Sequence, residues 1–372
     1  MAEKATEKMT GAQVLIRALE DTGVDVLFGY PGGQAIDIYN ALYDSKKLNH
    51  ILVRHEQGAT HAADGYARAT GKVGTVLVTS GPGATNTVTG IATAYMDSIP
   101  MVVICGQVAA GSLGTDAFQE SDMTGITLPI VKHSYLVHSP QDIAKTVAQA
   151  YYIASTGRPG PVVIDFPSNL AKAQNVAYSY PDDIKLESYK PTVKGNAKQI
   201  RQAARQLQKA KQPVIYAGGG ILSSGASDEL LQLAETLQIP AVISLVGKGC
   251  FPETHPLCLG MPGMHGSKAA NYALQESDLI FAIGTRFADR VTGRLSDFAP
   301  NAKVIHVDID PAEIGKNRNA NIPIVGDAKT VLKSLNAELA KDEVKPLTKD
   351  WLKTTSPCFF AISSKSCIAY SG

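Results

Sequence analysis

Two successive series of short apolar runs, separated by segments with helical spacing, constrain the fold of this chain more than any other feature. The first series has six runs before residue 170: VDVLFGY (24–30), HILVR (50–54), TVLVTS (75–80), MVVICG (101–106), SYLVHS (134–139) and PVVIDFP (161–167). Helical periodicity occupies segments between them, such as 11–22 and 141–155. Strands that alternate with helices are typical of an open parallel sheet covered by helices, so we predict an α/β fold.

The second series has five runs: PVIYAGGG (213–220), AVISLVG (241–247), LIFAIGTRF (279–287), KVIHVDID (303–310) and IPIVGDA (322–328). Polar residues with two prolines, Pro181 and Pro191, separate the two series and favour a linker. We therefore predict two consecutive parallel-sheet α/β domains, at residues 1–175 and 196–345, joined by a linker at 176–195. Residues 346–372 show neither periodicity and are expected to form a tail.

The composition is that of an ordinary globular protein, with 44% hydrophobic and 19% charged residues in 372. Lys and Arg (35) nearly balance Asp and Glu (34), so charge indicates neither a nucleic-acid nor a membrane partner. The start, MAEKATEKMT, does not resemble a signal peptide, and no apolar run approaches the roughly 20 residues that span a bilayer. The five cysteines form no CxxC pair, so a reduced, cytoplasmic setting is expected.

Glu56 is the first candidate for chemistry. The stretch RHEQGATHAADGYARATGKVG (54–74) ends one strand, which we interpret as buried, and opens a helix of small residues. Glu56 lies at that junction, where α/β folds place their ligand sites. The alternative is an acid in a first helical turn, where the helix dipole favours it. Position alone favours the alternative.

Glycine-rich loops follow three strands of the first half: GYPGG (29–33), SGPGATN (80–86) and GQVAAGSLG (106–114). Each could present backbone N–H groups to an anion, although most such loops only make a turn. None has the Walker or the GxGxxG spacing, so no nucleotide-phosphate site is predicted there. The histidines of this half lack metal-ligand spacing and are not interpreted as ligands: His55, His61, His133 and His138.

The second half has its own glycine-rich loops, GGG (218–220), LGMPGMHG (259–266) and GTRFADRVTG (284–293). The strand after them ends in Asp308 and Asp310, and an acid at a strand end beside glycine loops is how a sheet holds a nucleotide. Alternatively these acids cap a helix near Pro311, which is the stronger interpretation for Asp310. Arg286 and Arg290 could bind phosphate or carboxylate, or form surface ion pairs.

Ten motifs together resemble the FAD-containing acetohydroxyacid (acetolactate) synthase catalytic subunits, which are thiamine-diphosphate enzymes: FGYPGG, RHEQGA, GYARATGK, TSGPGATN, DSIP, GTDAFQE, GRPGPVVIDFP, GMHG, RFADRVTG and HVDIDPAEIGKN. The resemblance covers roughly residues 10–350. TSGPGATN and GRPGP are shared across related 2-keto-acid enzymes, whereas GTDAFQE and RFADRVTG indicate this member. The catabolic acetolactate synthases without FAD lack the RFxDRVTG run.

By this resemblance the first domain binds the pyrimidine of thiamine diphosphate. Glu56 would contact the aminopyrimidine ring and favour the imino tautomer that removes the C2 proton, and the cofactor would then perform the carbon chemistry. Ser98 and Gln119 match positions that line the same cofactor pocket. Arg290 matches the arginine that meets the carboxylate of the second keto acid. The resemblance thus implies Glu56, Gln119 and Arg290 as catalytic residues.

The same resemblance makes the central domain an FAD-binding domain, in which the flavin is structural and takes no redox step. The residues implied to bind cofactor there are Arg158, Gly218, Ser244, Leu245, Gly263, Met264, His265, Gly284, Thr285, Arg286, Asp289, Arg290, Asp308, Ile309 and Asp327. Two positions depart from the family pattern. Ala288 stands where RFDDR is usual, and Ser168 stands where many members have lysine beside the substrate channel.

The family also has a third domain, in which Gly-Asp-Gly followed by Asn binds Mg²⁺ and the cofactor's diphosphate. No Gly-Asp-Gly occurs here, and the nearest match, Gly326-Asp327-Ala328, belongs to the FAD domain. We therefore expect a C-terminally truncated form, with no metal site of its own, that is inactive alone.

The activity implied for the lineage condenses two pyruvates, or pyruvate with 2-oxobutyrate, with loss of CO₂. This is the first common step of branched-chain amino-acid synthesis. Implied partners are a second copy in a homodimer or tetramer and a small regulatory subunit. The alternatives are a non-catalytic FAD-binding fragment that associates with full-length or regulatory subunits, and another thiamine-diphosphate enzyme. Among those, pyruvate oxidase would need a redox-active flavin, and glyoxylate carboligase lacks an acid at the position of Glu56.

Overall fold

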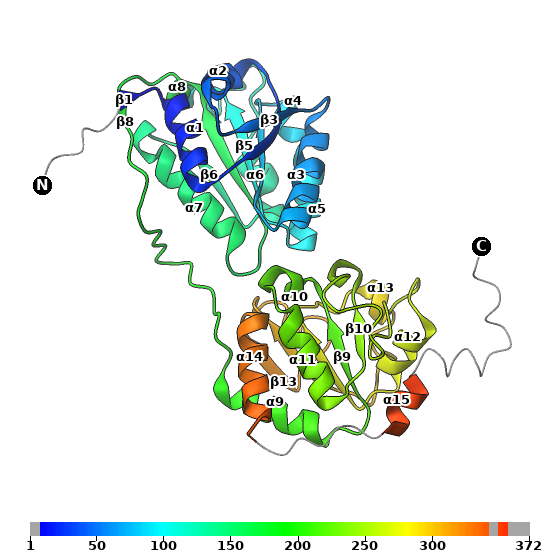
Figure 1. Ribbon diagram of the computed structural model, residues 1–372. Coiled ribbons are helices and arrows are strands. Elements are labelled where there is room, and N and C mark those ends of the chain that lie inside the picture. The colour runs from blue at the N-terminus through cyan, green and yellow to red at the C-terminus, as the bar shows by residue number, and fades with distance from the viewer. Residues whose placement is uncertain (1–7, 342–348, 356–372) are drawn as a thin grey trace, which may run out of the picture. The chain divides into compact units, whose positions relative to one another are not determined.

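The computed structural model describes residues 8–341 and 349–355 (Figure 1). The chain divides into two compact units, Met1–Lys190 and Pro191–Gly372. The division falls within the stretch 176–195 that the sequence indicates as a linker. Of the expected tail, 346–372, only residues 349–355 are described, and the rest lies outside the described residues.

The first unit is built on a six-stranded sheet in the order β3-β2-β4-β5-β7-β6, and every neighbouring pair is parallel. All six apolar runs of the first series form these strands, as predicted. Their bounds are β2 (Val26–Tyr30), β3 (Asn49–Leu52), β4 (Gly74–Val78), β5 (Met101–Gln107), β6 (His133–Leu136) and β7 (Pro161–Pro167).

Helices cover both faces of this sheet (Figure 1). They are α1 (Gly11–Thr22), α2 (Ile36–Asp44), α3 (Glu56–Thr70), α4 (Pro82–Thr85), α5 (Val88–Asp97), α6 (Met123–Thr127), α7 (Ile143–Ser155) and α8 (Ser168–Ala171), with short 3₁₀ turns at Gly33–Ala35, Ala110–Ser112, Leu128–Ile130 and Pro140–Asp142. Side chains alternate between faces along a strand. Leu77 accordingly joins the core formed with α1 and α7, whereas Val76 and Val78 join the core formed with α3 and α5.

Two features of this unit differ from expectation. The strand expected to be buried before Glu56, β3, is an edge strand, and Ile51 and Leu52 are 41% and 64% exposed. An apolar run indicates a strand but not whether a second strand pairs with its far side. In addition, β1 (Lys8–Met9) pairs antiparallel with β8 (Val176–Ala177) inside the expected linker. Strands of two residues are too short to show a periodicity.

The second unit has a five-stranded sheet in the order β10-β9-β11-β12-β13, again with every pair parallel. The five runs of the second series form it, as predicted: β9 (Pro213–Ala217), β10 (Ala241–Ile243), β11 (Leu279–Ile283), β12 (Lys303–Asp308) and β13 (Ile322–Val325). Its helices are α9 (Ala197–Lys209), α10 (Gly219–Ser224), α11 (Ser227–Leu237), α12 (Lys268–Gln275), α13 (Asp289–Thr292), α14 (Ala328–Leu339) and α15 (Lys349–Thr355), with a 3₁₀ turn at Leu245–Gly247.

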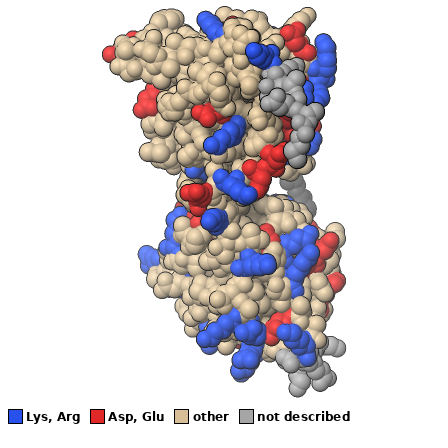
Figure 2. Space-filling model, turned by 90° about the vertical axis from the view of Figure 1, so that its left-hand side faces the viewer, with Lys and Arg blue, Asp and Glu red and all other residues tan. Residues whose placement is uncertain are grey.

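Two apolar cores hold this second sheet. Helices α9, α11 and α14 pack on one face and α12 on the other. Helix α15, which falls in the expected tail, also belongs to this unit, because Trp351 is buried and its Nε1 donates to Pro213 O at 2.9 Å. Basic and acidic side chains both occur on each unit on the face shown in Figure 2. None of the helices that the structure describes is both long and apolar enough to cross a bilayer.

Candidate functional site

Glu56 opens α3 directly after the edge strand β3. The preceding residue, His55, is the N-cap, and its Nδ1 accepts from Gln57 N at 3.1 Å. The Glu56 side chain is buried, at 9% exposure, and its Oε2 accepts a hydrogen bond from Asn86 Nδ2 at 2.9 Å. Burial and, as a smaller cause, the negative charge of Glu56 raise the pKa of the nearby Tyr39 phenol. Glu56 is thus an acid in a first helical turn, as the alternative holds, but it is also buried and held by a side chain of another loop.

Glycines of two predicted loops lie against the Thr79 side chain, and one of these glycines, Gly83, also lies beside this acid. A Cβ at Gly83 would lie 3.2 Å from Glu56 Oε1, and a Cβ at Gly32 would lie 2.5 Å from Thr79 Cγ2. The loops 29–33 and 80–86 therefore meet beside Glu56, at the carboxyl ends of β2 and β4. Any larger residue at Gly32 or Gly83 would push these loops apart or cover the side chains between them.

Gln119 lies at the same edge of the sheet, in the loop 114–122 that follows β5. Its φ is +60°, a strained backbone for a non-glycine residue, and such strain is kept only where neighbours hold it. A Cβ at Gly81 would lie 2.6 Å from Gln119 O, so the two loops touch through their backbones. Within the loop, the Glu120 carboxylate accepts from Gly114 N at 2.5 Å and Ala117 N at 3.2 Å. The Gln119 side chain is exposed at this surface.

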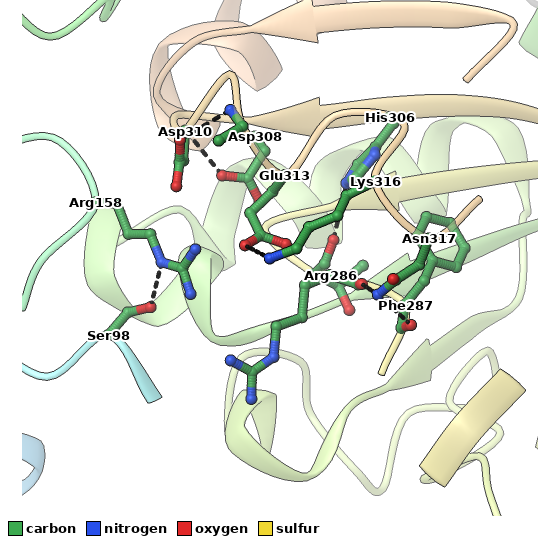
Figure 3. A network of polar contacts seen from close by, with 12 residues as sticks. Ser98, Arg158, Arg286, Phe287, His306, Asp308, Asp310, Glu313, Lys316 and Asn317 are labelled. Atoms are coloured by element: carbon green, nitrogen blue, oxygen red, sulfur yellow. Dashed lines mark hydrogen bonds and ion pairs between the residues drawn. The ribbon is translucent and has the colours of Figure 1, made fainter. Parts of the chain in front are cut away.

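Ser98 is placed differently from the expectation that it shares a pocket with Gln119. It precedes β5, and Arg158, which precedes β7, donates from Nε to Ser98 Oγ at 2.8 Å (Figure 3). Both residues thus lie at the amino ends of parallel strands, whereas Glu56 and Gln119 lie at the carboxyl ends. Because β5 has seven residues of about 3.3 Å each, the two edges are far apart. Within this unit Ser98 therefore lies far from Gln119, and its side-chain partner is Arg158. Its place in the cofactor pocket stays a prediction.

The cofactor candidates of the second unit gather at one edge of its sheet. Gly218 follows β9, Ser244 follows β10, Gly284 follows β11, Asp308 ends β12, and Asp327 follows β13. All five strands are parallel, so these positions share the carboxyl edge, where open α/β sheets bind ligands. Their neighbours in sequence, Leu245, Thr285, Arg286 and Ile309, lie on the same connecting loops.

Two glycine loops at this edge pack backbone against backbone. A Cβ at Gly218 would lie 2.1 Å from Gly284 O, and a Cβ at Gly220 would lie 2.6 Å from Gly284 Cα. Gly284 also has a φ of +57°, which favours glycine. Next to these loops, the buried hydroxyl of Ser244 has no hydrogen-bond partner among the residues that the structure describes. A polar ligand at this edge could approach the backbone of the glycine loops closely and form a hydrogen bond with the Ser244 hydroxyl.

The RFADR turn after β11 is held by side chains from elsewhere in the second unit (Figure 3). Phe287 is buried at a φ of +51°, which is unfavourable for a bulky residue. Asn317 Nδ2 donates to Arg286 O at 3.0 Å and to Phe287 O at 3.1 Å. His306 Nε2 lies 2.9 Å from Thr285 O, and burial lowers the pKa of His306, which favours its neutral form. Asn317 is not predictable as a support of this turn from the sequence, because nothing in its motif shows which backbone it contacts.

The loop 259–266 lies against the start of α13, which follows the RFADR turn. A Cβ at Gly263 would lie 2.7 Å from Arg290 O, and Asn271 exchanges two hydrogen bonds with the Gly263 backbone. Met264 and His265 are exposed on this loop, as are Asp289 and Arg290 at the start of α13. The structure thus brings the two expected segments together.

The acids after β12 make turns. Asp308 Oδ1 accepts from Asp310 N, and Asp310 Oδ1 accepts from Ala312 N, each at 2.9 Å. The expectation that Asp310 caps a helix near Pro311 is wrong, because residues 311–315 form turns and no helix. Asp327 does cap a helix, since its Oδ1 accepts from Thr330 N at 2.9 Å at the start of α14. Among the residues described, no cluster of three or more His, Cys, Asp or Glu could hold a metal ion.

Comparison with known proteins identifies both units. Residues 9–126 match the family described as "Thiamine pyrophosphate enzyme, N-terminal TPP binding domain", and residues 200–335 match "Thiamine pyrophosphate enzyme, central domain".

Similar proteins include the "Acetolactate synthase" of Mycobacterium bovis, which is 56% identical over 335 residues, or 90% of this chain and 54% of the relative. The "Acetolactate synthase large subunit" of Buchnera aphidicola from Acyrthosiphon pisum is 55% identical over 349 residues (94% and 61%), and the "Probable acetolactate synthase large subunit" of Methanocaldococcus jannaschii is 55% identical over 347 residues (93% and 58%). The chain therefore spans little more than half the length of these relatives. It belongs to the thiamine pyrophosphate enzyme family, of which it carries the N-terminal and the central domain.

Proposed function

We propose that this chain acts as part of an acetolactate synthase large subunit. The reaction condenses two pyruvates to 2-acetolactate, or pyruvate with 2-oxobutyrate to 2-aceto-2-hydroxybutyrate, with release of CO₂, and serves branched-chain amino-acid synthesis. The observation that carries this proposal is Glu56, buried and held by Asn86 at the carboxyl edge of the N-terminal domain. The names of the similar proteins agree with it.

Thiamine diphosphate, when bound, supplies the acidic carbon at which a 2-keto acid loses CO₂. Glu56 suits the aminopyrimidine of that cofactor because Asn86 occupies only its Oε2. The other oxygen, Oε1, faces Gly83, which has no side chain of its own. Glu56 would hold or move a proton at Oε1, and burial would strengthen that interaction relative to water. Gln119 and Arg290 are proposed to contact cofactor and the second keto acid, respectively.

FAD is proposed at the carboxyl edge of the second sheet. The paired glycine loops at Gly218 and Gly284 fit a diphosphate that approaches backbone closely, and the unpartnered Ser244 hydroxyl fits a polar group of the ligand. Arg286 is proposed to bind its anionic part, and Asp308 its ribose. In this role the flavin stabilises the fold, and no redox step is assigned to it.

The partners are proposed from the family resemblance. They are Mg²⁺ together with the cofactor's diphosphate, a second copy in a homodimer or tetramer, and a small regulatory subunit, in the cytoplasm. The first unit exposes two large apolar side chains, Leu52 and Phe118, at 64% and 85%, which a second chain could cover.

A chain extended to the length of its relatives tests the proposal. The 372 residues are joined to the C-terminal remainder of the Buchnera relative, and the product is assayed with pyruvate, thiamine diphosphate, Mg²⁺ and FAD. We expect acetolactate and CO₂, with an unchanged flavin spectrum. Bleaching of the flavin by pyruvate, with acetate or acetyl phosphate as product, would replace this proposal with an oxidase.

A further inference from the structure

We propose that Gln107 and Asp165 form a buried pair that positions the loop carrying Gln119. This rests on the proposed function only in that Gln119 is placed at the cofactor pocket. Neither residue has a role in the proposed chemistry, and both lie beneath the loop rather than on the pocket surface. They are positioning residues, because they reach Gln119 only through its backbone.

Gln107, the last residue of β5, forms hydrogen bonds through both the oxygen and the nitrogen of its side-chain amide. Its Oε1 accepts from Val108 N at 2.8 Å, and its Nε2 donates to Ser121 O at 2.9 Å and to Asp165 Oδ2 at 3.1 Å. The backbone N–H can only donate and the backbone carbonyl can only accept, so these partners fix which end of the amide faces which way. Gln107 is 1% exposed, so water does not replace these bonds.

Asp165 fixes Gln107 from the neighbouring strand. It lies in β7 opposite Cys105 of β5, and it is 3% exposed. Its Oδ2 accepts from Gln107, while its Oδ1 is buried without a hydrogen-bond partner among the described residues. A buried carboxyl group with one unsatisfied oxygen is costly. The side-chain partner of Asp165 is Gln107, which also donates to Ser121 O in the Gln119 loop. We therefore assign the buried carboxyl group to the positioning of that loop.

The loop that carries Gln119 is held at two places besides the hydrogen bond from Gln107 to Ser121 O. Glu120 closes the loop internally through Gly114 N and Ala117 N. Gln119 O rests against Gly81, and its backbone is kept at a φ of +60°. Ser121 O also accepts from Met123 N at 2.9 Å, which joins the anchor to the start of α6. Without the Gln107 side chain, Ser121 O would lose its hydrogen bond to β5, and the loop segment that follows Gln119 would no longer be tied to the sheet at this point.

Hydrogen–deuterium exchange on the 372-residue chain tests this pair without any ligand. Gln107→Met keeps the length of the side chain but removes the donor and the acceptor. We expect protection of amides in 114–123 to fall about tenfold, the equivalent of one hydrogen bond, while α1 and α7 keep theirs. Gln107→Leu, which also has no donor for Ser121 O, should behave in the same way and serves if the methionine variant does not fold. Gln174→Met, at an exposed amide, is the matched control and should change nothing.

Two substitutions of Asp165 distinguish a residue that positions the loop from one that only fills space in the core. Asp165→Asn keeps an oxygen that accepts from Gln107, so the loop should stay protected, whereas Asp165→Leu should release it. Unchanged loop protection in folded Gln107→Met, or an equal loss throughout α1 and α7, would overturn the proposal. A second series, on the chain extended to the length of its relatives and with added thiamine diphosphate and Mg²⁺, asks whether the cofactor protects the same loop. Failure of the cofactor to do so would count against the proposed contact of Gln119 and not against the Gln107–Asp165 pair.

Discussion

Asn86 Nδ2 donates a hydrogen bond to Glu56 Oε2 at 2.9 Å, and this bond joins a glycine-rich loop to the first residue of a helix 30 positions earlier. It orients the acid and leaves Oε1 beside Gly83. The candidate catalytic group is therefore fixed by two different βα connections of the same sheet.

Removal of this donor should impair both stability and activity. In Asn86→Ala, Glu56 Oε2 stays buried without its partner, so we expect the free energy of unfolding to fall by about 1–3 kcal/mol. In the extended chain, acetolactate formation should fall at least about tenfold, because the acid is no longer oriented. Urea unfolding and steady-state assay measure the two effects. Thr85→Ala, at the exposed neighbouring position, should change neither, and an Asn86→Ala variant with normal turnover would show that the bond does not matter for catalysis.

The buried Asp165 should make stability depend on pH. Burial raises the pKa of Asp165 from the ordinary 3.8 to about 7, against the lowering effect of Gln107. Because the folded value is the higher one, the stabilising contribution of its neutral form is complete below about pH 4 and is lost as pH rises through 7. Three pKa units correspond to at most about 4 kcal/mol. Asp165→Asn should therefore flatten the decline in unfolding free energy between pH 4 and 7, and an identical slope in both proteins would contradict this.

Asn317 should control how the second unit binds FAD. Asn317→Ala removes the two hydrogen bonds that hold Arg286 O and Phe287 O, and the positive φ of Phe287 then lacks its support. We expect the dissociation constant for FAD, measured by flavin fluorescence, to rise about tenfold. Asn301→Ala, at an exposed position of the same unit, is the control. Equal affinities of the two variants would show that the turn needs no such support.

A single methyl group at Gly218 should abolish flavin binding. In Gly218→Ala the new Cβ would lie 2.1 Å from Gly284 O, so the two glycine loops must separate. We expect no FAD uptake and a loss of unfolding free energy of about 2 kcal/mol or more. Gly65→Ala, inside α3 with open space around its Cβ, should instead be neutral or stabilise by up to about 1 kcal/mol. Normal flavin content in Gly218→Ala would place the FAD elsewhere.

The sequence predicts the two sheets well because the periodicity of buried strands is local. All eleven strands of the two parallel sheets come from apolar runs such as 75–80 and 213–220. The edge position of β3 is not predictable in this way, because it depends on which strands pair. The turn after Asp310 also differs, since Asp followed by Pro is equally compatible with a helix start and with a turn.

The candidate site was predicted in part for a similar reason. Topology places strand-end residues such as Glu56, Gly218 and Asp308 at one edge, so a strand assignment is enough to group them. Ser98 lies at the amino end of β5, away from Glu56 and Gln119, and a motif resemblance does not show at which end of a strand a residue lies. Hydrogen bonds between distant residues, such as those of Asn86 and Gln107, have no periodicity and were found only in the structure.

Substitution of Glu56 in the extended chain tests the proposed function most directly. Glu56→Gln keeps the size of the side chain and the oxygen that accepts from Asn86, but it removes the carboxylate. We expect acetolactate formation from pyruvate to fall at least about 100-fold, and the affinity for thiamine diphosphate to fall with it, because a proton can no longer be held at this position. FAD content, which depends on the other unit, should not change. Turnover equal to that of the unmodified chain would contradict the assignment of Glu56 and, with it, the proposed site.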